Sequence, residues 1–376
     1  MVNRDRLSET FQFLVGIDSV SGEEADICRE IRKILESMGA ETFVDNAGEK
    51  AGSNTGNLIA KFKGNTPAPP LLLNAHLDTV EPGRGVKVRF KDGIFTSDGN
   101  TILGADDKSA IAVLLETLQI LQEKNLPYGP LELVFTVCEE TGLLGAKHLD
   151  YSLISAKYGY ALDATDTEGI VTRAPSSNHL EFTVHGKDAH AGAAPEKGIN
   201  AIFLACKAVA GLEIGRIDRE TTCNIGIIEG GFATNIVPNL VTVKGEARSH
   251  DEDKLKQVTE RIVSSFKSVI ADYPSPSDGL PRLDMLVEKD FTRTHIPDDH
   301  LLVRLAQQAG ARLGRKIITK TSGGGADANV FFQKGIMTGV LGTGMRDMHT
   351  VRESVHLDDM ARTTELLLEI IKIYSD

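Results

Sequence analysis

The stretch Leu71 to Val80 reads Leu-Leu-Leu-Asn-Ala-His-Leu-Asp-Thr-Val. Its leucines form an apolar run typical of a buried parallel strand, and in open α/β sheets ligands bind at the carboxyl ends of such strands. His76 and Asp78 are two residues apart, so an extended backbone places both side chains on one face. A metal-binding imidazole usually donates its second N–H to a carboxylate. The stretch therefore indicates His76 as a metal ligand oriented by Asp78, with an ordinary polar loop as the alternative.

Length and composition indicate a globular protein with two domains. At 376 residues the chain is longer than most single hydrophobic cores allow, and its 41% apolar and 25% charged residues are ordinary for a folded protein. The net charge of -12 argues against binding to nucleic acid or to an anionic membrane surface. No stretch approaches the ~20 apolar residues of a membrane span, and the N-terminus has no secretion signal. The sequence thus predicts a cytoplasmic protein.

The cysteines support the same compartment. They have no paired spacing and lie in apolar patterns, so we expect reduced, buried thiols and not disulfides. These residues are Cys28, Cys138, Cys206 and Cys223.

Apolar strands alternate with amphipathic helices over the first part of the chain, which predicts an α/β domain whose sheet is flanked by helices. Ser21 and Glu24 have the spacing of a capping box before one helix, and Gly39 follows that helix as a C-terminal glycine should. Asp92 and Gly93 predict the turn of a peripheral hairpin. Besides the Leu71 strand, strands are predicted over 42–44, 57–62, 131–138 and 158–162, and helices over 4–17, up to 38 and over 104–121.

Acidic side chains lie at the same edge of the predicted sheet. Glu139 and Glu140 end one strand, Asp163 ends another, and Asp106 begins a helix. Such carboxylates would repel one another, and some would stay protonated unless cations joined them. Two divalent metal ions resolve this conflict, with one carboxylate bridging them and one histidine beyond His76 completing the set. For Asp106 taken alone, capping of the helix is the alternative explanation.

The chain changes character after Thr172, where half-exposed alternating strands replace buried ones. The order strand-helix-strand-strand-helix-strand predicts an α+β, ferredoxin-like unit inserted into the first domain. We therefore expect a catalytic domain over 1–175 and 292–376, and an inserted lid and dimerisation domain over 176–291 whose edge strand and helix pair with a second copy. The insert is predicted to contain strands 178–185, 224–229, 240–249 and 282–288 and helices 200–212 and 251–272.

The last part of the chain returns to the pattern of the first domain, with helices expected over 297–313 and 358–374 and a strand over 340–344. The glycine-rich turn 322–327 suggests a phosphate cradle, but no Lys-Ser/Thr follows it and its glycine spacing matches neither nucleotide-binding motif. This argues against a nucleotide-binding protein. His349 lies between the last strand and the last helix.

The motifs of this chain, in their order, resemble those of the co-catalytic di-zinc peptidases and deacylases, over nearly the whole length. Within that family, 145–148 (Gly-Ala-Lys-His) and 341–344 (Leu-Gly-Thr-Gly) are most similar to peptidase T, an aminotripeptidase. The chain departs from peptidase T at Gly323 and Ala326, where the family has an arginine and a threonine near the place that recognises substrate ends. The motifs are His76-Leu77-Asp78-Thr79-Val80, Gly104-Ala105-Asp106-Asp107-Lys108, Glu139-Glu140, Asp163 and His349-Thr350.

The resemblance implies two Zn²⁺ ions per subunit, in a ligand set that also accepts Co²⁺ or Mn²⁺. Asp106 is implied as the bridging ligand, and Glu139 as the general base that takes a proton from the water bridging the two ions, so that the resulting hydroxide attacks the scissile carbonyl. The family also has a cis peptide between the residues corresponding to Asp106 and Asp107. The implied ligands are His76, Asp106 and Asp163 for one ion, and Asp106, Glu140 and His349 for the other.

The resemblance implies three further site residues in the insert. His190 matches a histidine that stabilises the oxyanion, often from the partner subunit of a dimer, and a turn histidine is the alternative. Asn235 matches a substrate-contacting asparagine, or belongs only to the turn before a proline. Arg248 matches an arginine that binds a substrate carboxylate through a bidentate pair, or forms a salt bridge at a strand edge.

These features predict metal-dependent hydrolysis of short peptides, from the amino end, by a homodimer that associates through the insert. One alternative is an N-acyl-amino-acid deacylase or carboxypeptidase on the same scaffold. The alternative of another class is a non-catalytic peptide-binding protein. That protein would lack a ligand or the base, and this sequence contains them all.

Overall fold

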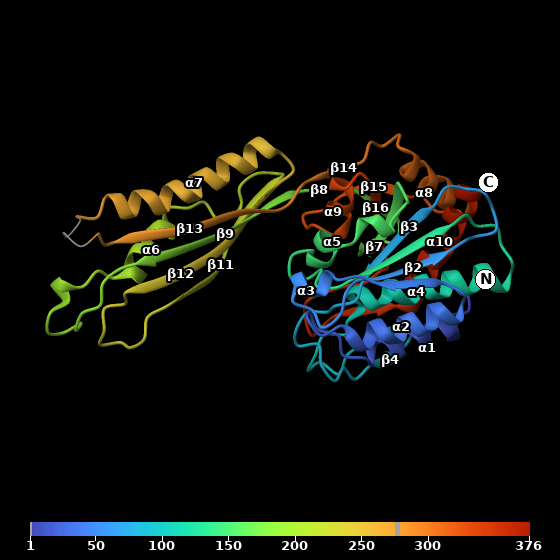
Figure 1. The fold of residues 1–376 in the computed structure, drawn as a ribbon, viewed down its shortest axis with the longest axis horizontal. Helices are drawn as coiled ribbons and strands as arrows, with labels where there is room; N and C mark the ends of the chain where they lie inside the picture. Colours follow the sequence, from blue (N-terminus) through green and yellow to red (C-terminus); the bar gives the residue numbers. More distant parts are fainter. Residues whose placement is uncertain (1, 275–278) are drawn as a thin grey trace. The chain divides into compact units, whose positions relative to one another are not determined.

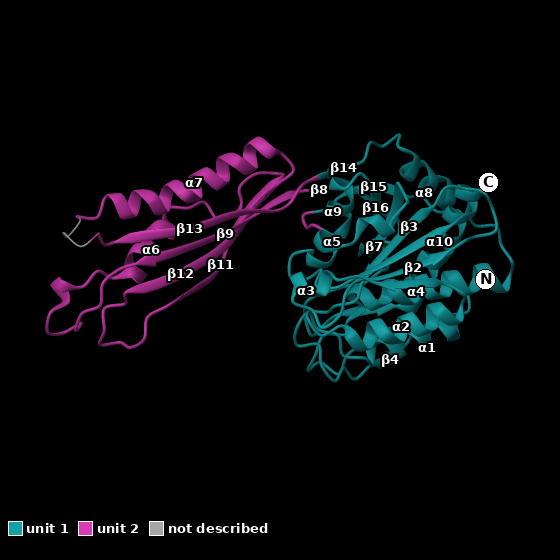
Figure 2. Ribbon diagram, in the orientation of Figure 1, with its two compact units in different colours: residues 1–173, 294–322, 326–376 teal, residues 174–293, 323–325 magenta. Residues whose placement is uncertain are grey.

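The computed structural model describes residues 2–274 and 279–376 (Figure 1). It divides into two compact units, each with a hydrophobic core of its own (Figure 2). Unit 1 comprises residues 1–173, 294–322 and 326–376, and unit 2 comprises residues 174–293 and 323–325.

The centre of unit 1 is a nine-stranded mixed sheet in the order β1-β2-β6-β3-β7-β16-β8-β14, with β15 paired to β8. β6, β3, β7 and β16 form parallel pairs, so their carboxyl ends meet at one edge of the sheet. Every residue of β3 is buried, as expected for a parallel strand covered on both faces. The strands are β1 (Glu41–Val44), β2 (Leu58–Phe62), β3 (Leu71–His76), β6 (Leu131–Thr136), β7 (Tyr158–Ala164), β8 (Gly169–Ala174), β14 (Thr294–His295), β15 (Ile318–Thr321) and β16 (Met337–Gly342).

The helix α4 lies at the centre of unit 1, and its buried residues lie on all of its sides. It packs against β3, α1 and α10, and this brings its acidic first turn to the end of β3, where the His76 N–H donates to Asp107 Oδ2 at 3.1 Å. A small sheet holds β4 (Arg89–Lys91), β5 (Ile94–Thr96) and β17 (Ser354–His356). The helices are α1 (Arg4–Val15), α2 (Ala25–Ser37), α3 (Ala47–Ala51), α4 (Ala105–Glu123), α5 (Leu144–His148), α8 (Leu301–Arg312), α9 (Asp327–Gln333) and α10 (Leu357–Ser375).

Unit 2 is an antiparallel sheet in the order β10-β11-β12-β9-β13, with α6 and α7 packed against each other and against β9 and β12 (Figure 1). Alternate residues of β9 point into its core, where Phe182 stacks on Phe266 of α7 with ring centroids 4.0 Å apart. The elements are β9 (Ser176–His185), α6 (Ala201–Ala210), β10 (Gly215–Arg216), β11 (Thr221–Gly230), β12 (Leu240–Ser249), α7 (Glu252–Ala271) and β13 (Arg282–Phe291).

The structure confirms the mixed α/β architecture and the ferredoxin-like insert, and it corrects one local prediction near the N-terminus. The positive φ angles of Gly39 and of Asp92 and Gly93 confirm the predicted helix end and hairpin turn. The predicted capping box is wrong. α2 has no side-chain cap, because Ser21 donates its hydroxyl to Asp78 and Glu24 accepts the Cys138 N–H.

Three further points differ from expectation. The helix expected from residue 297 begins only at Leu301, because His300 occupies its N-cap and accepts the Leu302 N–H. The short strands β8, β14 and β15 were not predicted from their composition. Cys206 is exposed on α6, whereas the other three cysteines are buried. In the described ranges, no helix combines the length and the apolar character that a membrane span requires.

Candidate active site

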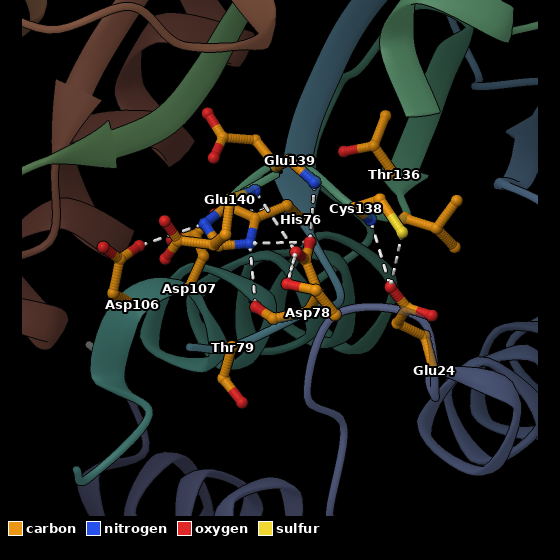
Figure 3. A network of polar contacts seen from close by, with 12 residues as sticks. Glu24, His76, Asp78, Thr79, Asp106, Asp107, Thr136, Cys138, Glu139 and Glu140 are labelled. Atoms are coloured by element: carbon orange, nitrogen blue, oxygen red, sulfur yellow. Dashed lines mark hydrogen bonds and ion pairs between the residues drawn. The ribbon is translucent and has the colours of Figure 1, made fainter. Parts of the chain in front are cut away.

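β3 ends at His76, whose imidazole is held from both sides (Figure 3). Its Nε2 lies 3.0 Å from Oδ1 of Asp106. Its Nδ1 lies 2.9 Å from the backbone carbonyl oxygen of Asp78 and 3.4 Å from the carboxylate of the same residue. Burial lowers the pKa of His76, but the hydrogen bonds to Asp106 and Asp78 outweigh burial and raise this pKa well above its usual range.

The Asp106 carboxylate lies between two imidazoles from distant parts of the chain. Its Oδ1 faces His76, and its Oδ2 lies 3.4 Å from Nε2 of His349. The same nitrogen of His349 lies 2.9 Å from Oε1 of Glu140. Burial works against ionisation of Asp106, but hydrogen bonds to the two imidazoles hold its pKa below the usual value. Hydrogen bonds to Asp106 and Glu140 raise the pKa of His349 to about 10.

Backbone hydrogen bonds fix the loop that carries Asp106. Glu353 is 1% exposed, and its carboxylate accepts the N–H groups of Leu103, Gly104 and Asp106 at 2.8, 2.7 and 2.9 Å. The peptide between Asp106 and Asp107 is cis, as the family resemblance implied. Glu353 follows His349 by four residues. Its buried carboxylate therefore joins the segment that carries His349 to the loop that carries Asp106.

Glu139 and Asp163 also lie near His76. One donor atom from each of these three residues lies within 4.8 Å of the others, and the same holds for His76, Asp106 and Glu140. Burial and the nearby Asp163 raise the pKa of Glu139 well above its usual value, and burial and Asp106 do the same for Asp163. In the absence of cations, these carboxylates therefore repel one another when they are ionised.

The donor set fits divalent cations. Imidazole nitrogens and carboxylate oxygens are the ligands of catalytic zinc sites, and the structure gathers both kinds at one edge of the sheet. Cations among these groups would offset the repulsion that raises the pKa of Glu139 and Asp163. The arrangement thus suits chemistry on a polarised carbonyl group with a carboxylate as proton acceptor.

Asp327 is a buried residue near this cluster that the sequence analysis did not single out. It is 2% exposed at the start of α9, and its Oδ2 accepts hydrogen bonds from the Thr136 hydroxyl and from Asn74 at 3.3 Å. Its Oδ1 has no hydrogen-bond partner among the described residues. Burial raises the pKa of Asp327 to about 6. The sequence signal for it was the polar Asn74 within an otherwise apolar strand.

His190 and Asn235 lie together in unit 2. The Ala191 N–H donates to the Asn235 carbonyl oxygen at 2.9 Å, and His190 forms a β-bridge with Ile236. The His190 Nδ1 accepts the N–H of Gly192 at 3.2 Å. In the neutral ring this leaves the proton on Nε2.

Arg248 lies at the other end of the same sheet. It pairs with Ser177 near the start of β9, whereas the segment of His190 follows the end of β9, where His185 pairs with Leu240. The guanidinium group of Arg248 lies 2.8 Å from Glu246 Oε2 and 5.8 Å from the centre of the Phe291 ring. The structure therefore does not bring Arg248 together with His190 and Asn235 within unit 2.

Comparisons with known proteins identify relatives of this chain. Residues 175–274 match the model of a peptidase dimerisation domain, and residues 57–190 match the model of peptidase family M28. The uncharacterised protein YqjE of Bacillus subtilis is 40% identical over 373 residues, which are 99% of each chain. The crystal structure of a tripeptidase from Staphylococcus aureus has a TM-score of 0.91 and 36% identity, over 100% of this chain and 99% of that one. Aminopeptidase PepT from Bacillus cereus has a TM-score of 0.86 and 39% identity over 100% of both chains.

The mixed sheet, the gathered imidazoles and carboxylates and these relatives define a metal-dependent peptidase. Such enzymes hydrolyse peptide bonds with the help of metal ions held by protein side chains. The chain belongs to the peptidase T-like family of metallopeptidases.

Proposed function

We propose that the chain is an aminopeptidase of short peptides that works with two zinc ions. The observation that carries this proposal is the position of the Asp106 carboxylate, whose Oδ1 faces His76 and whose Oδ2 faces His349. A carboxylate with one oxygen toward each histidine is arranged as a bridging ligand. His76 and Asp163 would complete one site, and His349 and Glu140 the other. Bound metal ions would supply a water molecule of lowered pKa and a polarised substrate carbonyl.

Glu139 is the proposed general base. It is 8% exposed and shares a cluster with His76 and Asp163. Its carboxylate takes a proton from the attacking water and delivers that proton to the leaving amine. Burial and the nearby Asp163 raise the pKa of Glu139, and a carboxylate in this position can accept a proton from water and return it to the leaving group.

The substitution Glu139→Ala tests this assignment. We expect the variant to keep its metal content and to lose kcat by a factor of about 10²–10⁴, the usual contribution of a positioned base. Elemental analysis and peptide hydrolysis are measured on the same preparation. Loss of metal would identify Glu139 as a ligand, and undiminished hydrolysis would refute its role as the base.

We further propose that His190, Asn235 and Arg248 contact the substrate, with His190 and Asn235 reaching the site of a second subunit. Within unit 2, the stretch from Leu240 to Arg248 alone spans ~26 Å at ~3.3 Å per strand residue. An extended tripeptide spans only ~10 Å. One copy of unit 2 therefore cannot present Arg248 and His190 to the same tripeptide, whereas two copies in a homodimer can divide these roles.

An apolar surface of unit 2 supports the homodimer. Ile202 and Phe203 on α6 are 38% and 58% exposed, Ile228 on β11 is 50% exposed, and Phe232 in the loop after β11 is 84% exposed. This loop lies beside α6, since a Cβ on Gly231 would lie 3.4 Å from Ile202 Cδ1. β11 is also an open edge beyond the two residues that pair with β10.

Sedimentation of Phe203→Asp tests the dimer, with Ile318→Asp in unit 1 as the control. Ile318 is also an exposed apolar residue, at 41%. We expect only the α6 variant to sediment as a monomer. Two monomeric variants or two dimeric ones would place the interface elsewhere.

A hydrolysis screen of di-, tri- and tetrapeptides and N-acyl-amino acids, after metal reconstitution, tests the substrate class. Release of the amino-terminal residue from tripeptides is the expected result. Gly323 and Ala326 replace the arginine and threonine of peptidase T, so the screen includes the products of a deacylase and a carboxypeptidase. Binding without cleavage would favour a non-catalytic peptide-binding protein. A cytoplasmic location is proposed with this activity, and the buried free thiols of Cys28, Cys138 and Cys223 support it.

A further inference from the structure

The loop that carries Glu139 has an unusual set of backbone hydrogen bonds (Figure 3). After β6 leaves the sheet, successive backbone N–H groups donate to side-chain oxygens and not to another strand. The three accepting residues come from separate parts of the chain, and all are 0% exposed. The donor and acceptor pairs are Val137 to Asn57 Oδ1 (3.1 Å), Cys138 to Glu24 Oε1 (3.1 Å), Glu139 to Asp78 Oδ1 (2.9 Å) and Glu140 to Asp78 Oδ2 (3.2 Å).

The carbonyl groups of the same loop are also paired. Val137, Cys138 and Glu139 accept N–H groups from residues 142–145. Cys138 has a φ of +50°, a conformation that a residue with a Cβ rarely adopts. Such a conformation persists only where the surrounding bonds impose it, and it is often found next to reacting groups.

Glu24 is the acceptor that acts on this unusual residue. Its Oε1 accepts the N–H groups of Cys138 and Gly22, at 3.1 and 2.9 Å, and lies 3.3 Å from the Cys138 thiol. Its other oxygen accepts the Ser53 hydroxyl. Glu24 is the N-cap residue of α2, but its side chain makes no capping hydrogen bond, so the helix itself does not explain why this carboxylate is buried.

We propose that Glu24 is a positioning residue for the general base. By holding the Cys138 peptide in its left-handed conformation, it sets the direction in which the next side chain, that of Glu139, leaves the backbone. Asp78 fixes the next peptide group, because its carboxylate accepts the Glu139 N–H at 2.9 Å. The Ser21 hydroxyl in turn donates to Asp78 at 2.7 Å. This inference rests on the proposed role of Glu139 as the base. It concerns the backbone that aims the base and not the metal ligands.

The chain contains a matched control for a purely structural role. Glu132 in β6 is 4% exposed, and it accepts the N–H groups of Ser155 and Ala156 at 2.9 Å and the Ser155 hydroxyl at 2.7 Å. Its N–H and hydroxyl partners are of the same kinds as those of Glu24, and it also lies 3.5 Å from the Lys61 ammonium group, but it is near the start of β6 and not at its carboxyl end. Glu24→Met and Glu132→Met both remove a buried carboxylate and keep an unbranched side chain.

The test compares these variants with Glu24→Gln. Glutamine can direct its oxygen to Cys138 and Gly22 and its NH₂ group to the Ser53 hydroxyl, so it keeps the bonds that matter here. We expect Glu24→Met to lower kcat by about 10- to 100-fold with KM and metal content unchanged, since a displacement of ~1 Å costs about that much. Glu24→Gln should stay within about threefold of the parent, and Glu132→Met should lose stability without losing kcat.

Hydrogen exchange gives a readout independent of turnover. In Glu24→Met, with or without metal, the amides of Cys138 and Glu139 should exchange faster, whereas in Glu132→Met the faster amides should be those of Ser155 and Ala156. Parent-like kcat in a folded Glu24→Met variant would overturn the inference, and so would an equal loss of kcat in Glu132→Met. If Glu139→Ala still hydrolyses peptides, the proposal that Glu139 is the base is wrong. This result distinguishes a failure of the proposed function from a failure of the role proposed for Glu24. If Glu24→Met does not fold, a kcat loss in Glu24→Gln that leaves Cys138 exchange unchanged would also overturn the inference.

Discussion

Replacing Glu353 by glutamine is expected to weaken both the fold and the metal site. The Glu353 carboxylate accepts two N–H groups on Oε2, from Leu103 and Gly104, and one on Oε1, from Asp106. Glutamine offers one oxygen and one NH₂ group, so at least one of these buried N–H groups must face another donor. The Asp106 N–H is the one left without an acceptor when the oxygen stays with Leu103 and Gly104.

The size of the effect follows from this count of bonds. One buried donor without an acceptor costs about 1–3 kcal/mol, and the two remaining hydrogen bonds lose the strengthening that an ionised acceptor gives, about 1 kcal/mol in all. The free energy of unfolding should therefore fall by about 2–4 kcal/mol. Because Asp106 lies between His76 and His349, metal affinity should also fall, by about 10- to 100-fold as for other groups that support a metal ligand.

Urea unfolding and competitive zinc titration measure these two quantities. The control is Glu36→Gln on α2, since Glu36 and its partner Arg32 are both 45% exposed and 2.7 Å apart, and such a surface pair should change stability by less than about 1 kcal/mol. Equal unfolding and zinc-binding free energies in the two variants would refute the role of Glu353. A loss of stability with parent-like zinc affinity would restrict that role to folding.

Three further outcomes are expected from the same cluster. His349→Ala should bind one metal ion per subunit in place of two, by elemental analysis, and retention of both would remove His349 from the ligand set. In chelator-treated protein, hydrogen bonds to Asp106 and Glu140 raise the pKa of His349 from 6.5 to about 10. The protonated ring therefore stabilises the fold fully below pH ~6.5, and this contribution is lost as the pH rises through ~10. Urea unfolding should accordingly show a lower stability at pH ~10 than at pH ~7, and the difference should be smaller in His349→Ala. Burial raises the pKa of Asp327 from 3.8 to about 6, so its ionised form destabilises the fold. In the chelator-treated protein, Asp327→Asn should therefore raise the free energy of unfolding by up to ~3 kcal/mol at pH ~7.5 and by little at pH ~4. A pH-independent effect of Asp327→Asn would show that its ionisation is not the cause.

The topology explains why the main cluster could be predicted from sequence. His76 ends β3, Glu139 and Glu140 follow β6, and Asp163 lies near the end of β7, and these strands are parallel neighbours. Parallel strands bring their carboxyl ends to one edge, so polar residues at those ends must lie close together whatever the exact register. The convergence of these side chains is thus a property of the strand pattern.

The supporting contacts could not be predicted in the same way, because they depend on distant acceptors. Ser21 and Glu24 have the local spacing of a capping box. In the structure, however, the Ser21 hydroxyl donates to the Asp78 carboxylate, and the Glu24 carboxylate accepts the Cys138 N–H. Nothing in the sequence near Glu353 indicates that it binds a loop about 250 residues earlier, as the structure shows. The separation of Arg248 from His190 depended likewise on strand register, which periodicity alone does not set.

Two groups among the buried carboxylates of unit 1 differ in their surroundings, and the difference separates support from chemistry. Asp78, Glu24 and Glu353 accept hydrogen bonds from backbone N–H or hydroxyl donors, although burial still raises the pKa of Glu353. Glu139 and Asp163 instead face other carboxylates, which with burial raise their pKa well above the usual range. Carboxylates of the first kind need no cation, since the protein already supplies positive partial charge. Those of the second kind face like charges, so cations would offset their repulsion, as expected for a metallopeptidase.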